Sequence, residues 1–166
     1  MKKIIIAFVV IFIANLGCKK ISDGDGLCGC SPITPPSLHL VIKSAVGTDL
    51  LNTENAGAYS PNQIQLFQKD NSGAIKQLRF HIRPGFSFGS EKFNYYQLYS
   101  DEVGILAQIA NQSFYLKLGD ANPRELKVQL NNTTNRIEKL SIDKKDAPVE
   151  TGEVSKYAGS IFYLTL

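Results

Sequence analysis

The stretch that decides the fold reads Phe114-Tyr-Leu-Lys-Leu-Gly-Asp-Ala-Asn-Pro-Arg-Glu-Leu-Lys-Val-Gln-Leu130. Every second residue is Phe, Leu or Val in its first five positions and again in its last five. This period of two is typical of half-buried β-strands, because successive side chains of a strand point to opposite faces of the sheet. The Gly, Asp, Asn and Pro between them favour a turn. The stretch therefore predicts two strands joined by a turn.

The same alternation recurs on both sides of this stretch. It predicts further strands at residues 38–42, 64–66, 78–82, 93–99, 137–142 and 162–166, and a short one at 105–109. Broken alternation within residues 137–142 indicates a β-bulge. No segment shows a convincing helical period, and a parallel sheet would need helical crossovers. The predicted fold is an all-β, antiparallel β-sandwich of immunoglobulin-like or related type over residues 38–166.

The chain is short and nearly neutral. Its length of 166 residues corresponds to about one domain, and 43% hydrophobic residues are enough to form a core. The formal net charge is +3, and it falls to +1 without Lys2 and Lys3. Because the sequence has no concentrated basic patch, we do not expect nucleic acid among its partners.

The first 17 residues have the pattern of a signal peptide. Lys2 and Lys3 precede an uncharged, largely apolar run of 13 residues from Ile4 to Leu16. As a helix this run would span about 20 Å, which is shorter than the ~30 Å hydrocarbon core of a bilayer. Residues 18–37 are rich in Gly and Pro and have little apolar content, so they are predicted to form a flexible tether.

Cys18 follows Gly17 directly after the apolar run. This arrangement resembles the lipobox of bacterial lipoproteins, although Asn15 stands where that pattern prefers an aliphatic residue. The resemblance implies a diacylglyceryl group on the Cys18 sulfur and anchoring to the outer membrane by acyl chains. Ordinary signal-peptidase cleavage remains the alternative. Acidic residues soon after Cys18 loosely resemble the export signal of surface lipoproteins, which leaves both the periplasmic and the surface orientation open.

Two further cysteines, Cys28 and Cys30, lie within the tether. An oxidising envelope would favour a disulfide between them, with Gly29 bending to close the tight ring. The surrounding stretch offers no base to activate a thiol and no ligands to complete a zinc site. We therefore expect Cys28 and Cys30 to be an incidental or structural pair, and we expect no bound metal.

The sequence contains no catalytic motif. His39 and His81 are its two imidazoles, and neither lies in a recognisable nucleophile context. A small glycan-acting hydrolase stays open as an alternative, because scattered acids could form the pair of carboxylates that glycoside hydrolysis needs. Those acids are Asp49, Glu54, Glu91, Asp101, Glu102 and Glu125. We expect neither catalysis nor a cofactor.

Two stretches are candidates for ligand binding. Arg79, His81 and Arg83 share one face of a predicted strand, where they form a polar, partly cationic stripe suited to an anionic glycan or an acidic protein. The alternative for this stripe is an ordinary solvent-exposed face. The second stretch is aromatic, and its ring residues could stack on sugars or anchor a protein, with core packing as the alternative. Its candidate residues are Phe86, Phe88 and Tyr96.

A wider resemblance rests on several short motifs. They are the Cys18 tether, the strand at residues 38–44, Gly47-x-Asp49-Leu50-Leu51, Tyr59, Ile64-x-Leu66 and Ile161-Phe162-Tyr163-Leu164. Together they are similar to small cell-envelope lipoproteins of Bacteroidota with a single β-rich domain. This resemblance implies no catalytic residue for the chain. From the residues themselves, Gly47 to Asp49 reads as a turn in which the aspartate accepts hydrogen bonds from main-chain amides.

These observations predict a lipid-anchored envelope protein whose β-sandwich is a non-catalytic binding or assembly module. A carbohydrate-binding surface lipoprotein is the first alternative. Assembly would use an unpaired sheet edge, for which the final strand is the candidate.

Overall fold

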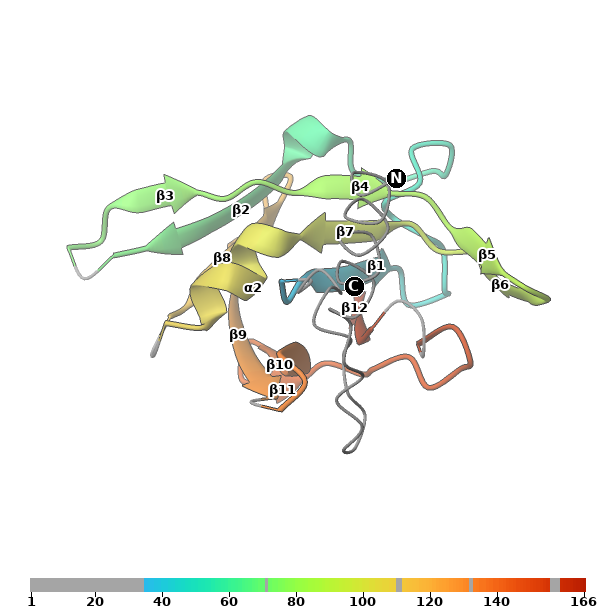
Figure 1. Cartoon of the computed structure of the whole chain (residues 1–166). Helices are drawn as coiled ribbons and strands as arrows, with labels where there is room; N and C mark the ends of the chain where they lie inside the picture. Colours follow the sequence, from blue (N-terminus) through green and yellow to red (C-terminus); the bar gives the residue numbers. More distant parts are fainter. Residues whose placement is uncertain (1–34, 71, 110–111, 132, 156–158) are drawn as a thin grey trace, which may run out of the picture. The chain divides into compact units, whose positions relative to one another are not determined.

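The computed structural model describes residues 35–70, 72–109, 112–131, 133–155 and 159–166, and β-strands make up most of its regular secondary structure (Figure 1). One compact unit extends from Pro35 to Leu166. The predicted signal peptide, the lipidation site Cys18 and the pair Cys28 and Cys30 lie outside the described residues. They stay predictions.

The larger sheet has six strands, ordered β11-β10-β9-β8-β2-β3, and all its neighbouring strands are antiparallel. The stretch from Phe114 to Leu130 forms β8, a turn and β9, as predicted. The predicted bulge lies in β10, between Ile137 and Lys139. The strand bounds are β2 Ile64–Lys69, β3 Ile75–Gln77, β8 Phe114–Leu118, β9 Arg124–Asn131, β10 Arg136–Ile142 and β11 Lys145–Asp146.

The smaller sheet has four strands in the order β12-β1-β7-β4. Their bounds are β1 Leu38–Lys43, β4 His81–Arg83, β7 Gln97–Ser100 and β12 Ile161–Thr165. The first and last strands of the domain lie side by side, and this pair is parallel. The outer side of β12 is partly covered, because Glu150 N donates to Ile161 O at 2.8 Å and Tyr163 N donates to Pro148 O at 2.9 Å. From Ile161 to Tyr163 the final strand therefore does not offer the open edge suggested for assembly.

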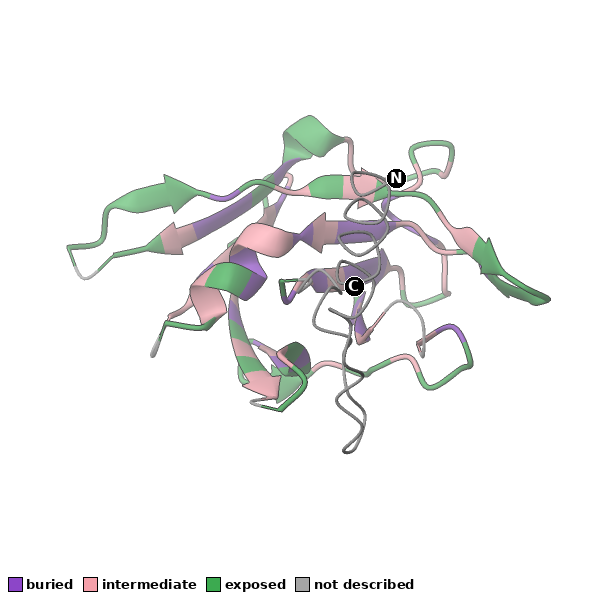
Figure 2. Cartoon of the chain, in the orientation of Figure 1, coloured by how far each residue is buried: buried purple, intermediate pink, exposed green. Residues whose placement is uncertain are grey.

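The core lies between the two sheets. Leu40 of β1 and Leu98 of β7 belong to the same buried cluster as Leu66 of β2 and Phe114 of β8. Figure 2 shows buried residues along β1, β2 and β7, and exposed residues along β3 and the hairpin of β5 (Phe86–Phe88) and β6 (Glu91–Phe93). This arrangement confirms the prediction of an all-β sandwich.

A helix stands where a short strand was expected at residues 105–109. Helix α2, Asp101–Ala107, begins after Ser100, whose side chain accepts a hydrogen bond from Val103 N. Asp101 and Glu102 in the first turn suit the positive end of the helix dipole. The strand prediction was wrong because a few apolar residues fit a period of two and a helical period equally well. One turn of 3₁₀-helix, Pro61–Gln63, precedes β2.

Two predicted strands differ in the structure. The strand expected at residues 78–82 forms only from His81, as β4 of the four-stranded sheet, and residues 78–80 connect it to β3 of the six-stranded sheet, which ends at Gln77. Between β3 and β4, side chains bind the main-chain groups of Arg79 in place of a neighbouring strand. Glu102 accepts from Arg79 N at 2.7 Å, and Ser100 Oγ donates to Arg79 O at 2.7 Å. The strand expected at 93–99 is divided into β6 and β7, and Tyr96 N between them donates to Asp49 Oδ2 at 2.6 Å.

Candidate functional site

The four-stranded sheet places polar and aromatic side chains on its side away from the main core. In β1, Leu38, Leu40 and Ile42 face that core, so His39 lies on the opposite face. The register aligns His39 with Tyr99 of β7, and Tyr99 with His81 of β4. We call this side the outer face, and its polar and aromatic residues are His39, Gln97, Tyr99, His81 and Arg83.

A small second core covers part of the outer face. Val41 and Ile161 from the sheet pack there with Phe93 of β6 and with Val154. Phe86, Tyr95 and Tyr163 pack around this cluster. Within the described part of the chain, this second core does not extend to the β7–β4 side of the outer face, which carries Tyr99, His81 and Arg83.

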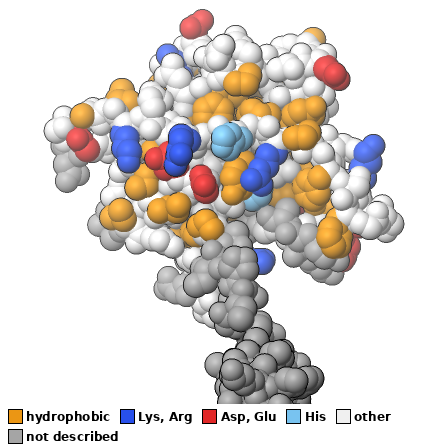
Figure 3. Space-filling model, turned by 45° about the horizontal axis from the view of Figure 1, so that its top comes forward, with side chains coloured by type: hydrophobic (Ala, Val, Ile, Leu, Met, Phe, Trp, Pro, Cys, Tyr) orange, Lys and Arg blue, Asp and Glu red, His pale blue; other side chains and the backbone are white. Residues whose placement is uncertain are grey.

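Arg83 lies over the ring of Tyr99. The guanidinium carbon is 3.3 Å from the ring centroid, within the range of a cation–π contact. None of the ion pairs among the described residues includes Arg83. Figure 3 shows the two histidines on one surface of the molecule, with Lys or Arg side chains beside them. An arginine that packs on an aromatic ring can still bind an anion through the N–H groups of its guanidinium.

His39 is held from both ring nitrogens. Gln97 Oε1 can only accept, so His39 Nδ1 donates to it at 3.0 Å, and His39 Nε2 then accepts from Ser37 Oγ at 3.1 Å. The imidazole meets Tyr99 edge-on, with 5.1 Å between ring centroids. His39 thus supports the ring on which Arg83 rests, which makes it a positioning residue of the outer face.

Burial lowers the pKa of His39 below its usual value of 6.5. The hydrogen bond to Gln97 opposes this shift, and the positive charge of Arg83 adds to it. The folded protein therefore holds a neutral His39 at pH values where the unfolded chain already binds a proton.

This difference predicts a pH-dependent stability. As the pH falls below 6.5, the unfolded state binds more protons at His39, so the free energy of unfolding should fall by up to about 1.4 kcal/mol per pH unit. Urea unfolding between pH 7.5 and 5.5 measures this slope. His39→Gln should flatten it, whereas His81→Gln, which removes an exposed imidazole, should keep it. An unchanged slope in His39→Gln would contradict the assignment.

At the opposite end of the outer face, the cation lies on a tyrosine that is hydrogen-bonded to an acid. Lys43 Nζ lies 4.8 Å from the centroid of the Tyr163 ring, and the Tyr163 hydroxyl donates to Glu150 Oε2. Burial and the hydrogen bond to Glu150 raise the pKa of Tyr163. The bond to Tyr163 lowers the pKa of Glu150, and the charge of Lys43 contributes to that shift. This end therefore has less unbalanced positive charge for an incoming anion than the Arg83 end.

The predicted cationic stripe is solvent-exposed, but its members have different surroundings. Arg79, His81 and Arg83 are all exposed. Arg79 Nε lies 3.7 Å from Glu102 Oε2, so Arg79 already has an acidic neighbour. Sequence reasoning missed Gln97, Tyr99 and the supporting role of His39, and the alternation of polar residues along 38–43 and 97–100 was the signal that could have found them.

The aromatic candidates lie in different parts of the structure. Phe86 packs in the second core, 5.6 Å from Phe93 between ring centroids. Tyr96 is partly buried against the main core, and Phe88 is 47% exposed at the end of β5. Phe86 and Tyr96 are thus used in packing.

Three of the six acids considered for a hydrolase form hydrogen bonds or an ion pair within the protein. Asp49 is buried and accepts from two main-chain amides. Glu102 binds Arg79, and Glu125 accepts from Ser113 Oγ at 3.1 Å. Among the described residues, no group of three His, Cys, Asp or Glu side chains is placed to hold a metal ion.

Comparisons with models of protein families, with curated proteins and with solved structures found no match. Within the part of the chain that the structure describes, no helix is long and apolar enough to cross a membrane.

Proposed function

We propose that this chain is a non-catalytic binding module that captures an acidic glycan on its outer face, while a lipid on Cys18 holds it at the cell envelope. The observation that carries the proposal is the contact of Arg83 with Tyr99, at 3.3 Å, without an acidic partner for Arg83 among the described residues. A guanidinium binds a carboxylate or sulfate through two parallel hydrogen bonds. This geometry suits the acidic groups of a uronic acid or sulfated sugar.

The neighbours of Arg83 favour a sugar over a small free anion. Tyr99 contributes an aromatic surface, and aromatic rings bind the apolar faces of sugars. His81 lies on the same side of β4, directly opposite Tyr99 in the register, and adds a hydrogen-bonding group. Because Tyr99 is supported by His39, which Gln97 holds by a hydrogen bond, the binding groups are held in place before a ligand arrives, which reduces the entropy lost on binding.

The test measures binding to acidic and neutral polymers. The purified protein is titrated with polygalacturonate, heparin and uncharged dextran by isothermal calorimetry. We expect binding to at least one acidic polymer and none to dextran. Arg83→Gln should weaken that binding about tenfold or more, as expected when a charged hydrogen-bonding group is lost. Arg83→Lys should weaken it too, because lysine keeps the charge but loses the planar fork.

Arg136→Gln is the matched control. Arg136 is an exposed arginine of β10, in the other sheet, and its replacement changes the net charge by the same amount. The affinity of Arg136→Gln for the polymer should stay within about twofold of the wild type, because dissolved salt screens the interaction between an exposed charge and a distant binding site. Equal losses in Arg83→Gln and Arg136→Gln would show that net charge alone drives binding. That outcome, or binding to none of the acidic polymers, would overturn the proposal.

A further inference from the structure

Strand β9 pairs with β10 over a longer stretch than with β8. Its pairing with β10 continues from Leu126 opposite Ile142 to Asn131 opposite Arg136. Its pairing with β8 ends at Leu126, opposite Phe114. Residues 127–131 therefore have a strand partner on one side only, within the described part of the chain. This open edge lies inside the six-stranded sheet, in line with β8.

The main-chain groups on the open side can be assigned from the ladder. Asp143 N donates to Glu125 O at 2.9 Å, so Glu125 is turned toward β10. Successive residues of an antiparallel strand turn their N–H and C=O groups to opposite sides. Lys127 and Gln129 are therefore turned toward β10, whereas Val128 and Leu130 direct their N–H and C=O groups to the open side.

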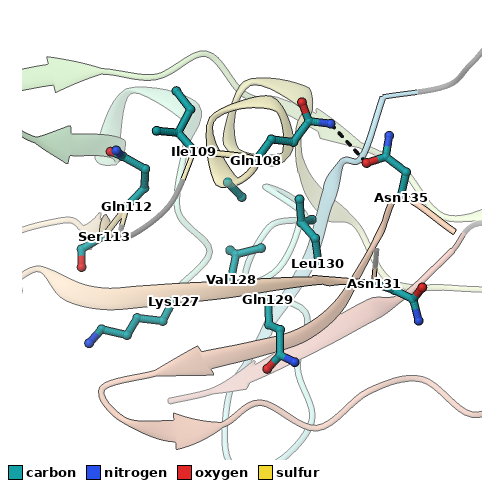
Figure 4. A pocket seen from close by; sticks show the side chains of 11 residues that line it. Gln108, Ile109, Gln112, Ser113, Lys127, Val128, Gln129, Leu130, Asn131 and Asn135 are labelled. Carbon is teal, nitrogen blue, oxygen red and sulfur yellow. Dashed lines mark hydrogen bonds between the residues drawn. The ribbon is translucent and has the colours of Figure 1, made fainter. Parts of the chain in front are cut away.

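A groove of about 610 Å³ follows this edge. Ala107 at the end of α2, with Gln108 and Ile109, lines its opposite wall, where Ile109 is 56% exposed. Figure 4 shows the side chains of Val128 and Leu130 pointing from β9 toward the helix end, whereas Lys127 and Gln129 point the other way. Gln108 Nε2 donates to Asn135 Oδ1 at 3.1 Å across one end of the groove. The walls thus combine apolar side chains with uncharged amides.

We infer that this groove accepts an extended segment of a partner protein, which adds to the sheet as a strand beside residues 127–131. A second polypeptide backbone is the ligand whose donors and acceptors repeat at the spacing of the open edge. The alternate side chains of the segment would pack on Val128, Leu130 and Ile109, so they should be apolar. None of the described residues that line the groove is a carboxylate, and Lys127, the one charged residue among them, points away. An uncharged, alternating segment therefore fits it.

This inference is independent of the glycan proposal, because it concerns the other sheet and different residues. It also differs from assembly through the final strand, whose outer side Pro148 and Glu150 already occupy.

The test uses peptides of defined length on the whole protein. Random heptapeptides displayed on phage are selected against the purified protein, and the best binder is synthesised with a fluorescent label. Two further versions of this peptide carry N-methyl groups on alternate backbone nitrogens. One is methylated at its odd-numbered residues and the other at its even-numbered residues. We expect one version to lose binding at least about hundredfold and the other to bind normally, because a strand turns only every second N–H toward its partner.

Variants of Val128 locate the peptide on the protein. Val128→Pro removes an N–H on the open side and leaves the bonds of Lys127 and Gln129 to β10, so peptide affinity should fall about tenfold. Val128→Thr keeps the N–H and the branched shape, and should bind within about twofold of the wild type. Far-UV circular dichroism checks that Val128→Pro is folded. If it is not, the methylated peptides on the wild-type protein decide.

Three results would overturn the inference. They are the selection of no peptide above background, equal binding of the two methylated peptides, and wild-type affinity in a folded Val128→Pro protein. Because none of these measurements involves an acidic polymer, failure here is distinguishable from failure of the glycan proposal.

Discussion

Asp49→Ala is expected to lower the free energy of unfolding by about 3 kcal/mol or more, because it leaves two main-chain amides without an acceptor. The Asp49 carboxylate accepts from Leu51 N at 2.8 Å and from Tyr96 N at 2.6 Å, and the residue is 8% exposed. The bond to Leu51 closes a turn within the loop after β1, and the bond to Tyr96 joins that loop to the segment before β7. Losing them should loosen both, which urea unfolding of the purified protein measures.

Asp120→Ala is the matched control for this change. Asp120 is an exposed aspartate of the turn between β8 and β9, so its loss should change stability by less than about 0.5 kcal/mol. If Asp49→Ala were as mild as Asp120→Ala, water would have to reach both amides in the folded state. The role assigned to the buried carboxylate would then be wrong.

Gly104→Ala should destabilise the fold by at least about 3 kcal/mol, although alanine is the better helix former by about 1 kcal/mol. A Cβ at this position of α2 would lie 1.8 Å from the carbonyl oxygen of Pro36 and 2.3 Å from its carbon. Both neighbours are main-chain atoms just before β1, so neither can turn away as a side chain would. The helix must shift, and the packing of Val103 on the core would be lost with it.

Gly152→Ala provides the comparison for Gly104→Ala. A Cβ there would meet the end of the Glu150 side chain at 2.9 Å, and the residue is exposed. Since that side chain can move, the change in unfolding free energy should stay below about 1 kcal/mol in either direction. Thermal and urea unfolding of the two variants side by side measure the contrast. Similar losses in both would show that α2 does not need close contact with Pro36.

Several parts of the fold followed from local patterns. Gly47 has a φ of 87°, and Asp49 accepts main-chain hydrogen bonds, as expected from a Gly and an Asp in a turn. The bulge in β10 and the strands β1, β2, β8 and β9 also lie where alternation predicted them. Each of these features depends on residues within a few positions of one another, which is the range that a sequence pattern reports.

The candidate site was predictable only in part. The polar stripe identified Arg83 and His81 as exposed, because alternation reveals which side chains share a face. It could not reveal that Arg83 lies on Tyr99, or that His39 from β1 supports that ring. These residues meet across three strands, and their order in a sheet depends on pairings between distant segments.

The sequence by itself determined the class of the fold, the positions of most strands and the exposure of the stripe, because hydrophobic alternation and turn residues act locally. The tertiary structure alone decided which sheet each strand joins. It divided residues 75–83 between two sheets, placed the first and last strands in parallel, and left residues 127–131 of β9 with an open edge. The physical reason is that strand pairing satisfies main-chain hydrogen bonds between any two extended segments, so packing of the whole core selects the partners.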